Sequence, residues 1–325
     1  MSAPATGAGG EGHREDDAPP RPPPSTILHP SRVAAAQMTS TTDTGANYAA
    51  VARLAGAAAA AGCSMLFLPE AFAFLGPNPA ATVAAAQPLT GPLMARYRAL
   101  AAATGLWLSL GGFQEAGAPP EDGGFTPRCF NTHVVVDDKG GLVAAYRKVH
   151  LFDAEGLRES ACTAPGSEGG VVVQGTPCGA LGLSICFDLR FALFFDDLQF
   201  SSGLGTYAVR VLAIPAAFTL ATGANHWDLL LRARAVETQS AVVAAAQAGR
   251  HNENRVSYGH AVIFDAWGNC LARVGGEAPE DETALHAEGL AIADVGEDAV
   301  EAVRMRMPLA AARARGRAVT AAMRA

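Results

Sequence analysis

The chain has 325 residues, of which 50% are hydrophobic and 17% charged, and its formal net charge is −7. This composition is typical of a globular protein, and an acidic balance without basic runs argues against nucleic acid or an anionic membrane as partner. No apolar run reaches the roughly 18 residues that span a bilayer. Six cysteines without a CxxC pair indicate neither a disulfide framework nor a zinc site, so a reducing compartment, the cytoplasm, is expected.

Residues 1–31 form a segment of low complexity, rich in glycine, proline and acidic side chains. Such a segment cannot bury a core, so we expect a disordered tail. A cleaved peptide for import into an organelle is the alternative, although such peptides are poor in acidic residues. Residues 32–313 are predicted to form one domain, and residues 314–325 a C-terminal tail.

The first part of this domain alternates strands and helices. Short apolar runs predict buried strands at residues 33–38, 65–68 and 107–113. Alanine-rich segments with helical spacing predict helices at residues 45–62 and 91–104, the first ending at glycine.

The second part of the domain combines hairpins with further strands and a helix. Asp-Asp-Lys-Gly-Gly and Asp-Ala-Trp-Gly-Asn are turn sequences, and they predict hairpins at residues 132–146 and 257–274. The remaining predicted elements are strands at 209–216, 241–247 and 289–295 and a helix at 225–239 that starts with Asn-x-x-Asp. This mixture predicts a two-layered β core with helices outside, not a purely parallel sheet.

Three chemically active side chains follow predicted strands. The apolar run at 181–185 delivers Cys186 to the carboxyl end of a buried strand, where α/β proteins place their chemistry. Glu70 follows the strand at 65–68, and Lys148 follows the first hairpin. Each residue by itself has a simpler interpretation: Cys186 could be a buried core thiol, and Glu70 and Lys148 could be ordinary surface charges. The sequence has no nucleotide, dinucleotide or metal motif, so no cofactor is expected.

Together the sequences around these side chains resemble the signature blocks of the nitrilase or carbon–nitrogen hydrolase superfamily. The blocks are Leu-Pro-Glu at 68–70, Tyr-Arg-Lys-Val-His-Leu-Phe at 146–152 and Gly-Leu-Ser-Ile-Cys-Phe-Asp-Leu-Arg-Phe at 182–191. The resemblance implies an α/β fold, a four-layer αββα sandwich of mixed sheets with helices on both outer faces, which pairs as a homodimer. It also implies an enzyme that acts on small-molecule amides without cofactor or metal.

The resemblance implies a Glu-Lys-Cys triad. Cys186 is the expected nucleophile, Glu70 the general base and acid, and Lys148 the cation that stabilises the oxyanion. A nearby ammonium and a helix amino terminus favour a thiolate. The backbone N–H of Phe187 is the expected second oxyanion donor. Glu159 matches a second glutamate, which would hold Lys148 and order the substrate amide.

Further segments are similar to the deaminated-glutathione amidase branch of this superfamily, at residues 108–113, 226–239 and 244–260. The branch implies hydrolysis of glutathione whose amino group has become a keto group, with 2-oxoglutarate and cysteinylglycine as products. Alternatives are an ω-amidase acting on 2-oxoglutaramate or 2-oxosuccinamate, and a nitrilase acting on a C≡N bond. An inactive scaffold would be expected to lack members of the triad.

A keto-acid substrate needs a cationic contact for its carboxylate. Arg190, Arg250 and Arg255 are the candidates, and a structural ion pair is the alternative for each. For Arg190 we expect pairing with nearby carboxylates.

Two departures from the family pattern bear on the pocket. Residues 151–158 form a shorter segment than the family's usual loop, which leaves the pocket and the assignment of Glu159 open. Residues 190–195 are Arg-Phe-Ala-Leu-Phe-Phe where the family has Arg-Phe-Pro-Glu-Leu, and a longer stretch follows to residue 208. These apolar residues indicate either a subunit contact or an irregular segment.

Overall fold

The computed structural model describes residues 30–118, 127–154, 157–200, 208–275 and 288–324, with side chains as far as residue 316. Nearly all of the expected N-terminal tail lies outside these ranges. The elements in chain order are β1 (Ser31–Met38), α1 (Thr44–Ala60), β2 (Met65–Leu68), α2 (Pro79–Ala85), α3 (Pro92–Thr104), β3 (Trp107–Ala118), β4 (Arg128–Val136), β5 (Leu142–Arg147), β6 (Asp153–Ala154), β7 (Leu157–Arg158), η3 (Glu159–Ala161), β8 (Val172–Thr176), β9 (Gly179–Leu183), η4 (Cys186–Arg190), α4 (Ala192–Phe200), β10 (Val211–Ala213), α5 (Leu220–Thr238), β11 (Ala241–Ala244), β12 (Ala246–Asn252), β13 (Arg255–Tyr258), β14 (Val262–Phe264), β15 (Cys270–Arg273), β16 (Gly289–Val295), α6 (Glu297–Arg306) and α7 (Leu309–Arg324).

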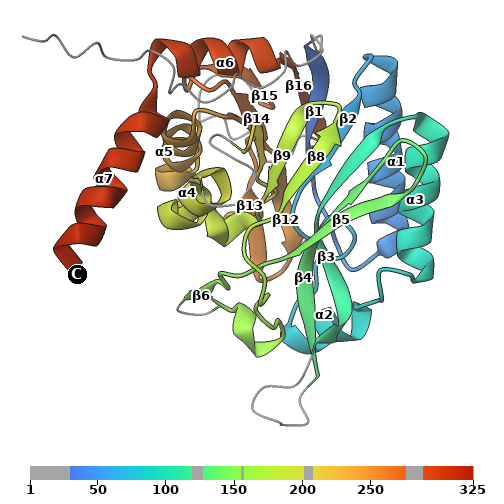
Figure 1. Cartoon of the computed structure of the whole chain (residues 1–325). Helices are drawn as coiled ribbons and strands as arrows, with labels where there is room; N and C mark the ends of the chain where they lie inside the picture. Colours follow the sequence, from blue (N-terminus) through green and yellow to red (C-terminus); the bar gives the residue numbers. More distant parts are fainter. Residues whose placement is uncertain (1–29, 119–126, 155–156, 201–207, 276–287, 325) are drawn as a thin grey trace, which may run out of the picture.

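Two mixed sheets form the centre of the molecule (Figure 1). The first has the strand order β13-β12-β1-β2-β3-β4-β5, with β16 paired to β1, and the second has the order β15-β14-β11-β10-β9-β8. Parallel pairs such as β1 with β2 occur beside antiparallel pairs such as β3 with β4. The mixed topology agrees with the sequence pattern of βαβ units and hairpins.

Alternation along the strands of the first sheet defines the layers. In β1, Val33 and Ala35 face the second sheet, where they join a core with Leu181 of β9. Ala34 and Ala36 face the other way, into a second core with α1 and α3. On the far side of the second sheet, Trp227 and other residues of α5 pack against its strands. The expected αββα sandwich is confirmed.

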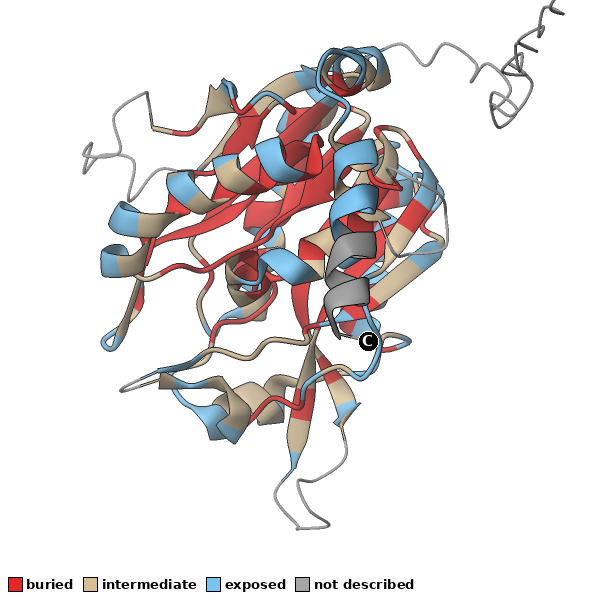
Figure 2. Ribbon diagram, turned by 60° about the vertical axis from the view of Figure 1, so that its left-hand side comes forward, coloured by how far each residue is buried: buried red, intermediate tan, exposed pale blue. Residues whose placement is uncertain are grey.

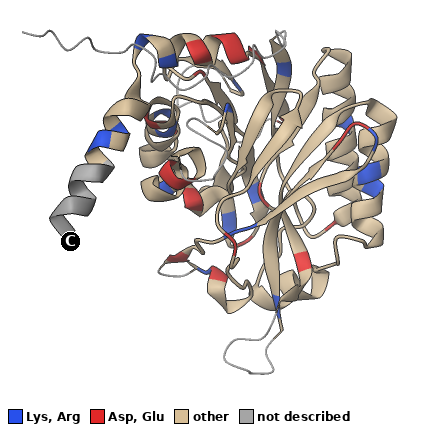
Figure 3. Ribbon diagram, viewed as in Figure 1, with Lys and Arg blue, Asp and Glu red and all other residues tan. Residues whose placement is uncertain are grey.

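The outer helices cover both sheets. Figure 1 shows α1 and α3 over one sheet and α4 and α5 over the other, and Figure 2 shows the buried residues concentrated between them. In Figure 3, which colours the charged residues on the ribbon, both signs are interspersed over the molecule. The last helix, α7, crosses the expected domain boundary at residue 313, and Arg313 pairs with Asp196 of α4 at 3.1 Å. Among the described helices, none is both long and apolar enough to cross a membrane.

Three of the differences between the predicted and the observed elements arise because tertiary contacts decide them. The predicted start of the helix at Asn225 is wrong: α5 begins at Leu220, where the Thr219 hydroxyl accepts from the N–H of Thr222. The side chain of Asn225 instead donates to Ala221 O one turn earlier, at 2.8 Å. No apolar pattern marked this first turn.

The other two differences arise where the chain changes sheets. The run predicted as one strand at 241–247 forms β11 in the second sheet and β12 in the first. The hairpin predicted at 257–274 is restricted to β14 and β15, because Ser257 lies in β13, which pairs with β12. Uninterrupted apolar runs do not indicate which sheet a residue joins, so this crossing has no signal in the sequence.

Two glycines of β3 allow neighbouring segments of the chain to approach this strand closely. A Cβ atom on Gly111 would lie 2.0 Å from Cβ of Pro215, a separation that no side chain tolerates. Gly112 has a φ of +78°, and a Cβ there would lie 2.8 Å from Oδ1 of Asn131 and 3.0 Å from Cα of Glu70. Glycine at 111 therefore lets β3 approach Pro215, and glycine at 112 leaves room for Asn131 and Glu70.

Candidate active site

The structure brings Glu70, Lys148 and Cys186 to one cavity of about 790 Å³. Each follows a strand, β2, β5 and β9 respectively, and each is at least nine-tenths buried. The ammonium of Lys148 lies 2.9 Å from Oε1 of Glu70, although the two residues are 78 positions apart in the chain. Three residues placed at separate strand ends by the sequence therefore form one cluster.

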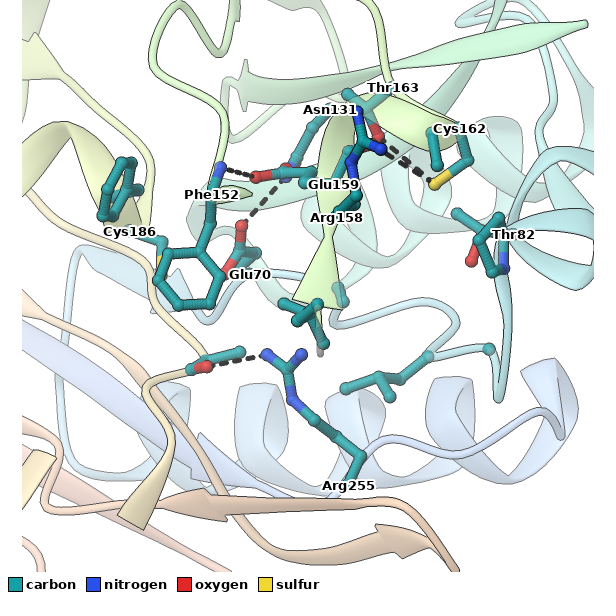
Figure 4. Close-up of a pocket in the computed structure, with 18 of the residues that line it drawn as sticks. Glu70, Thr82, Asn131, Phe152, Arg158, Glu159, Cys162, Thr163, Cys186 and Arg255 are labelled. Carbon is teal, nitrogen blue, oxygen red and sulfur yellow. Dashed lines mark hydrogen bonds between the residues drawn. The ribbon is translucent and has the colours of Figure 1, made fainter. Parts of the chain in front are cut away.

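Glu159 completes this cluster from the start of η3. Its Oε2 and Oε1 lie 2.8 and 3.1 Å from Nζ of Lys148. The backbone N–H of Phe152 donates to Oε2 at 2.7 Å, which fixes the carboxylate (Figure 4). The short segment before Glu159 thus brings it to the position expected for the second glutamate. Lys148 lies between two carboxylates.

Asn131 also belongs to the site, although its sequence context did not reveal it. Its side-chain amide donates to Oε1 of Glu70 at 2.9 Å and to Oε1 of Glu159 at 3.1 Å. Its backbone carbonyl accepts from the N–H of Lys148 at 2.9 Å. The only sequence signal was its place immediately before the strand predicted at 132–136. That signal is weak, because a single asparagine beside a strand is indistinguishable from an ordinary loop residue.

The turn that carries Cys186 has an uncommon backbone. Cys186 has a φ of +47°, and its N–H donates to Pro215 O at 2.8 Å. Cys186 is the first residue of η4, a short 3₁₀ helix that ends at Arg190, and the α-helix α4 begins at Ala192. The expected helix amino terminus at Cys186 is therefore that of a short 3₁₀ helix. The segment 192–200 is helical, not irregular, and residues 201–207 lie outside the described ranges.

Asp188 joins the nucleophile turn to the lysine block. Its fully buried carboxylate accepts from the N–H of Ile185 at 2.9 Å and from the hydroxyl of Tyr146 at 2.8 Å. It also accepts from the N–H and Nδ1 of His150, at 3.1 and 2.7 Å. Because Tyr146 and His150 flank Lys148, one carboxylate fixes Cys186 and Lys148 relative to each other.

His133 supports the same turn from the first sheet. It lies 2.6 Å from the Ser109 hydroxyl through Nε2 and 3.0 Å from Ser184 O through Nδ1. Burial lowers the pKa of His133 to about 4, so the ring is neutral near pH 7 and donates from one nitrogen only. This cross-sheet bond holds the chain two residues before Cys186.

Burial and charge set the resting protonation state of the triad. Burial raises the pKa of the Cys186 thiol well above 9.0, and the charge of Glu70 adds to this, whereas Lys148 opposes it. Burial opposes ionisation of Glu70, but the charge of Lys148 and hydrogen bonds from Lys148 and Cys186 hold the pKa of Glu70 below 4.5. Despite its burial, Lys148 has a pKa well above 10.5 because of Glu159 and Glu70. These directions favour a neutral thiol beside an ionised carboxylate in the resting enzyme, which suits the expected role of Glu70 as the base that takes the thiol proton.

These directions predict the pH profile of kcat/KM. Activity requires ionised Glu70 and a protonated thiol for it to deprotonate. Because the pKa of Glu70 is lowered, the acid limb should lie below pH 4.5, and because the pKa of Cys186 is raised, an alkaline limb should lie above pH 9. Initial rates between pH 4 and 10 measure this. An acid limb near pH 7 would contradict an ionised Glu70 beside a neutral thiol.

Only two of the three candidate arginines lie at the cavity. Arg190 and Arg255 line the cavity, whereas Arg250 is exposed outside it, so Arg250 is wrong as a pocket residue. Nη2 of Arg190 lies 3.2 Å from Nδ1 of His226, and among the described residues no carboxylate pairs with it, contrary to expectation. Arg255 donates to Ala217 O at 2.9 Å. A fourth arginine, Arg158, also lines the cavity and was missed as a candidate.

The described lining of the cavity carries an excess of positive charge. Its cationic side chains are Lys148, Arg158, Arg190 and Arg255, and its anionic side chains are Glu70 and Glu159. Since Lys148 already binds both carboxylates, the three arginines remain to attract anionic groups of a ligand. The net excess of two charges suits a ligand with two carboxylates. Phe187 lies near them, in edge contact with Phe152 at 5.0 Å between ring centroids.

Comparisons with known proteins agree with this geometry. The family model for carbon-nitrogen hydrolase matches residues 32–305. The deaminated glutathione amidase of Homo sapiens is 42% identical over 282 residues, which cover 85% of this chain and 80% of the human protein. The crystal structure of the Caenorhabditis elegans NitFhit protein is similar with a TM-score of 0.75 and 35% identity, over 87% of this chain and 65% of that one. Nit3 of Saccharomyces cerevisiae, described as a member of branch 10 of the nitrilase superfamily, has a TM-score of 0.72 at 24% identity over 87% of this chain and 96% of that one.

Proposed function

The chain belongs to the carbon–nitrogen hydrolase family, and from that premise we propose that it hydrolyses deaminated glutathione to 2-oxoglutarate and cysteinylglycine. It is a hydrolase of carbon–nitrogen bonds other than peptide bonds. The observation that carries the mechanism is the cluster in one cavity where Lys148 and Asn131 hold the Glu70 carboxylate near the Cys186 thiol. The direction of both pKa shifts favours an ionised Glu70 and a neutral thiol.

In the first step the sulfur of Cys186 attacks the amide carbon while Glu70 accepts the thiol proton. The carbonyl oxygen becomes an oxyanion, which the ammonium of Lys148 and the backbone N–H of Phe187 stabilise. Glu70 then passes its proton to the amide nitrogen, the C–N bond breaks and the amine leaves. A thioester between the acyl group and Cys186 remains.

Water completes the reaction. Glu70 removes a proton from a water molecule, which attacks the thioester carbon, and Lys148 again stabilises the oxyanion. The C–S bond breaks, the acid leaves, and Glu70 returns the proton to the sulfur. Glu159 keeps Lys148 in position throughout by accepting a hydrogen bond from its ammonium, and Asn131 does the same for Glu70 by donating to its carboxylate and to that of Glu159.

The charge of the cavity supports the substrate. Deaminated glutathione carries two carboxylates, one on the keto-acid end and one on the glycine end, whereas 2-oxoglutaramate carries one. The two excess positive charges among the described lining residues match the former. The human relative carries the same activity in its name.

Turnover of both substrates by one preparation tests this proposal. We expect kcat/KM for deaminated glutathione to exceed that for 2-oxoglutaramate by about 10-fold or more, because one further charged contact forms. Coupled detection of 2-oxoglutarate measures the glutathione derivative, and ammonia release measures 2-oxoglutaramate. Preference for 2-oxoglutaramate would assign the enzyme to the ω-amidases, and hydrolysis of a nitrile alone would make it a nitrilase.

A homodimer, and residence in the cytoplasm, also belong to this proposal. Leu193 of α4 and Leu229 of α5 are 78% and 67% exposed, and Val236 of α5 is 46% exposed. Such exposed apolar side chains on two outer helices support a contact between subunits.

A further inference from the structure

The cavity continues past Glu159 into a part that the triad does not use. Its described lining there includes Thr82, Gln114, Cys129, Cys162 and Thr163. These side chains come from α2, β3, β4 and the segment after η3. A cavity of about 790 Å³ is in the range that holds a drug-sized ligand. An amide that releases only ammonia would leave this part of the cavity empty.

Arg158 stands where this part begins. It ends the short hairpin of β6 and β7 and directly precedes Glu159. Figure 4 shows it beside Cys162 and Thr163, well away from Arg255, which approaches from another wall. Arg158 and Arg255 therefore lie on different sides of the triad.

The guanidinium of Arg158 is not held in an ion pair with any described carboxylate, in contrast to Lys148 with Glu70 and Glu159. The pKa of the nearby Asp153 is lowered chiefly by hydrogen bonds with Ser160, whose N–H donates to Oδ1 at 3.0 Å, and the charge of Arg158 is only a minor cause. Such a guanidinium on a cavity wall is suited to a carboxylate of the ligand, which it can bind with two parallel hydrogen bonds.

The chemistry determines which end of the substrate points toward Arg158. The leaving nitrogen must receive its proton from Glu70, whose Oε1 contacts Lys148 and Asn131. Both of these also contact Glu159. The leaving amine therefore departs along the wall that holds Glu159, and the next residue on that wall is Arg158. In the binding mode proposed below, the acyl arm points the other way, toward Arg190 and Arg255, which also line the cavity.

We propose that Arg158 is a specificity-determining residue that binds the terminal carboxylate of the leaving amine. The substrates it selects are N-substituted amides whose amine portion is a short peptide or amino acid with a free carboxylate. Primary amides, which release ammonia, do not reach it. This inference rests on the proposed function, because it assigns one of the two carboxylates of the substrate.

Arg158→Gln tests the inference with three substrates. They are deaminated glutathione, its analogue with the glycine carboxylate converted to a carboxamide, and 2-oxoglutaramate. We expect kcat/KM for deaminated glutathione to fall about 10- to 100-fold, mainly through KM, because a charge-assisted hydrogen bond pair is lost. The ratio of kcat/KM for deaminated glutathione to that for 2-oxoglutaramate should fall by the same factor.

The carboxamide analogue separates direct binding from a general effect. The unaltered enzyme should lose a similar factor with this analogue, and Arg158→Gln should add little to that loss. Arg158→Lys should restore part of the activity toward deaminated glutathione, because it keeps the charge but not the fork geometry. Arg250→Gln is the matched control, since Arg250 lies outside the cavity, and it should leave all three rates unchanged.

The outcomes distinguish the inference from the proposed function. If the unaltered enzyme hydrolyses deaminated glutathione but Arg158→Gln lowers all three rates equally, or lowers none, the inference is wrong and the proposed function stands. If the unaltered enzyme does not hydrolyse deaminated glutathione, both are wrong. Thermal unfolding of each variant shows whether a lost rate comes from a lost fold.

Discussion

Cys186→Ala is expected to lower turnover by about 10⁴-fold or more while the protein stays folded. The thioester cannot form without the sulfur, which is the atom that shares a hydrogen bond with Glu70. The fold should persist because the side chain is small and the turn is held by the Pro215 and Asp188 bonds. Initial rates with deaminated glutathione and thermal unfolding measure the two effects.

Cys178→Ala is the matched control for this variant. Cys178 is a buried thiol between β8 and β9 that does not line the cavity. This variant should retain most of the turnover, and a haloacetamide should inactivate it as it inactivates the unaltered enzyme. Mass spectrometry should then find the label on Cys186. Substantial turnover by Cys186→Ala would contradict the thioester mechanism.

Lys148→Met is expected to lower both the rate and the stability. The oxyanion loses its charged partner, which should reduce kcat by about 10²- to 10³-fold. The fold loses the cation between two buried carboxylates, which should cost about 3–5 kcal/mol of the free energy of unfolding. The side chains of Lys148, Glu70 and Glu159 are only 1%, 10% and 14% exposed, so solvent screens this effect little. Urea unfolding at pH 7 measures the cost.

The contribution of Glu70 to the pH dependence of stability should have opposite signs in the unaltered protein and in Lys148→Met. With Lys148 present, the pKa of Glu70 is lowered, so its contribution to stability is present above pH 4.5 and is lost as the pH falls through the lowered pKa. Without Lys148, burial dominates and raises the pKa of Glu70 above its unfolded value. Lys148→Met should therefore become more stable as the pH falls from 7 toward 5, where Glu70 takes up a proton.

A double variant separates the two roles of Lys148. Lys148→Met with Glu159→Gln removes one of the two unpaired carboxylates and should recover part of the lost stability. It should not recover kcat, because the oxyanion still has no cation. If the double variant regained the rate together with the stability, Lys148 would be a structural residue and the oxyanion would be stabilised by other groups.

The sequence predicted the parts of the site that depend on local patterns. An apolar run that ends in a polar residue marks a strand end, so Glu70, Lys148 and Cys186 were each placed correctly without knowledge of their partners. Hairpin turns were found at Asp-Asp-Lys-Gly-Gly because turn chemistry is local. Asn131 was missed because its role depends on two carboxylates, 61 and 28 residues away in the chain.

The arginines show the same limit. Arg250 and Arg255 lie near each other in the sequence, yet only Arg255 reaches the cavity. Successive side chains of a strand point to opposite faces, and β12 and β13 run antiparallel, so closeness in the sequence does not put two side chains on the same side. Arg158 was treated only as part of a shortened segment. The hairpin of β6 and β7 places it on the cavity wall, and no composition or spacing rule indicates that.

The sequence by itself predicted a two-layered β core with outer helices and the strand ends that carry Glu70, Lys148 and Cys186, since side-chain periodicity and residue chemistry are local properties. The four-layer sandwich and the roles of the three residues were implied by the resemblance to the family. Only the tertiary structure decided the protonation state that the site favours for Cys186, the distances at which Glu70 and Glu159 contact Lys148, and the charge of the cavity. These depend on burial and on distances between residues far apart in the chain, which the packing of two sheets sets.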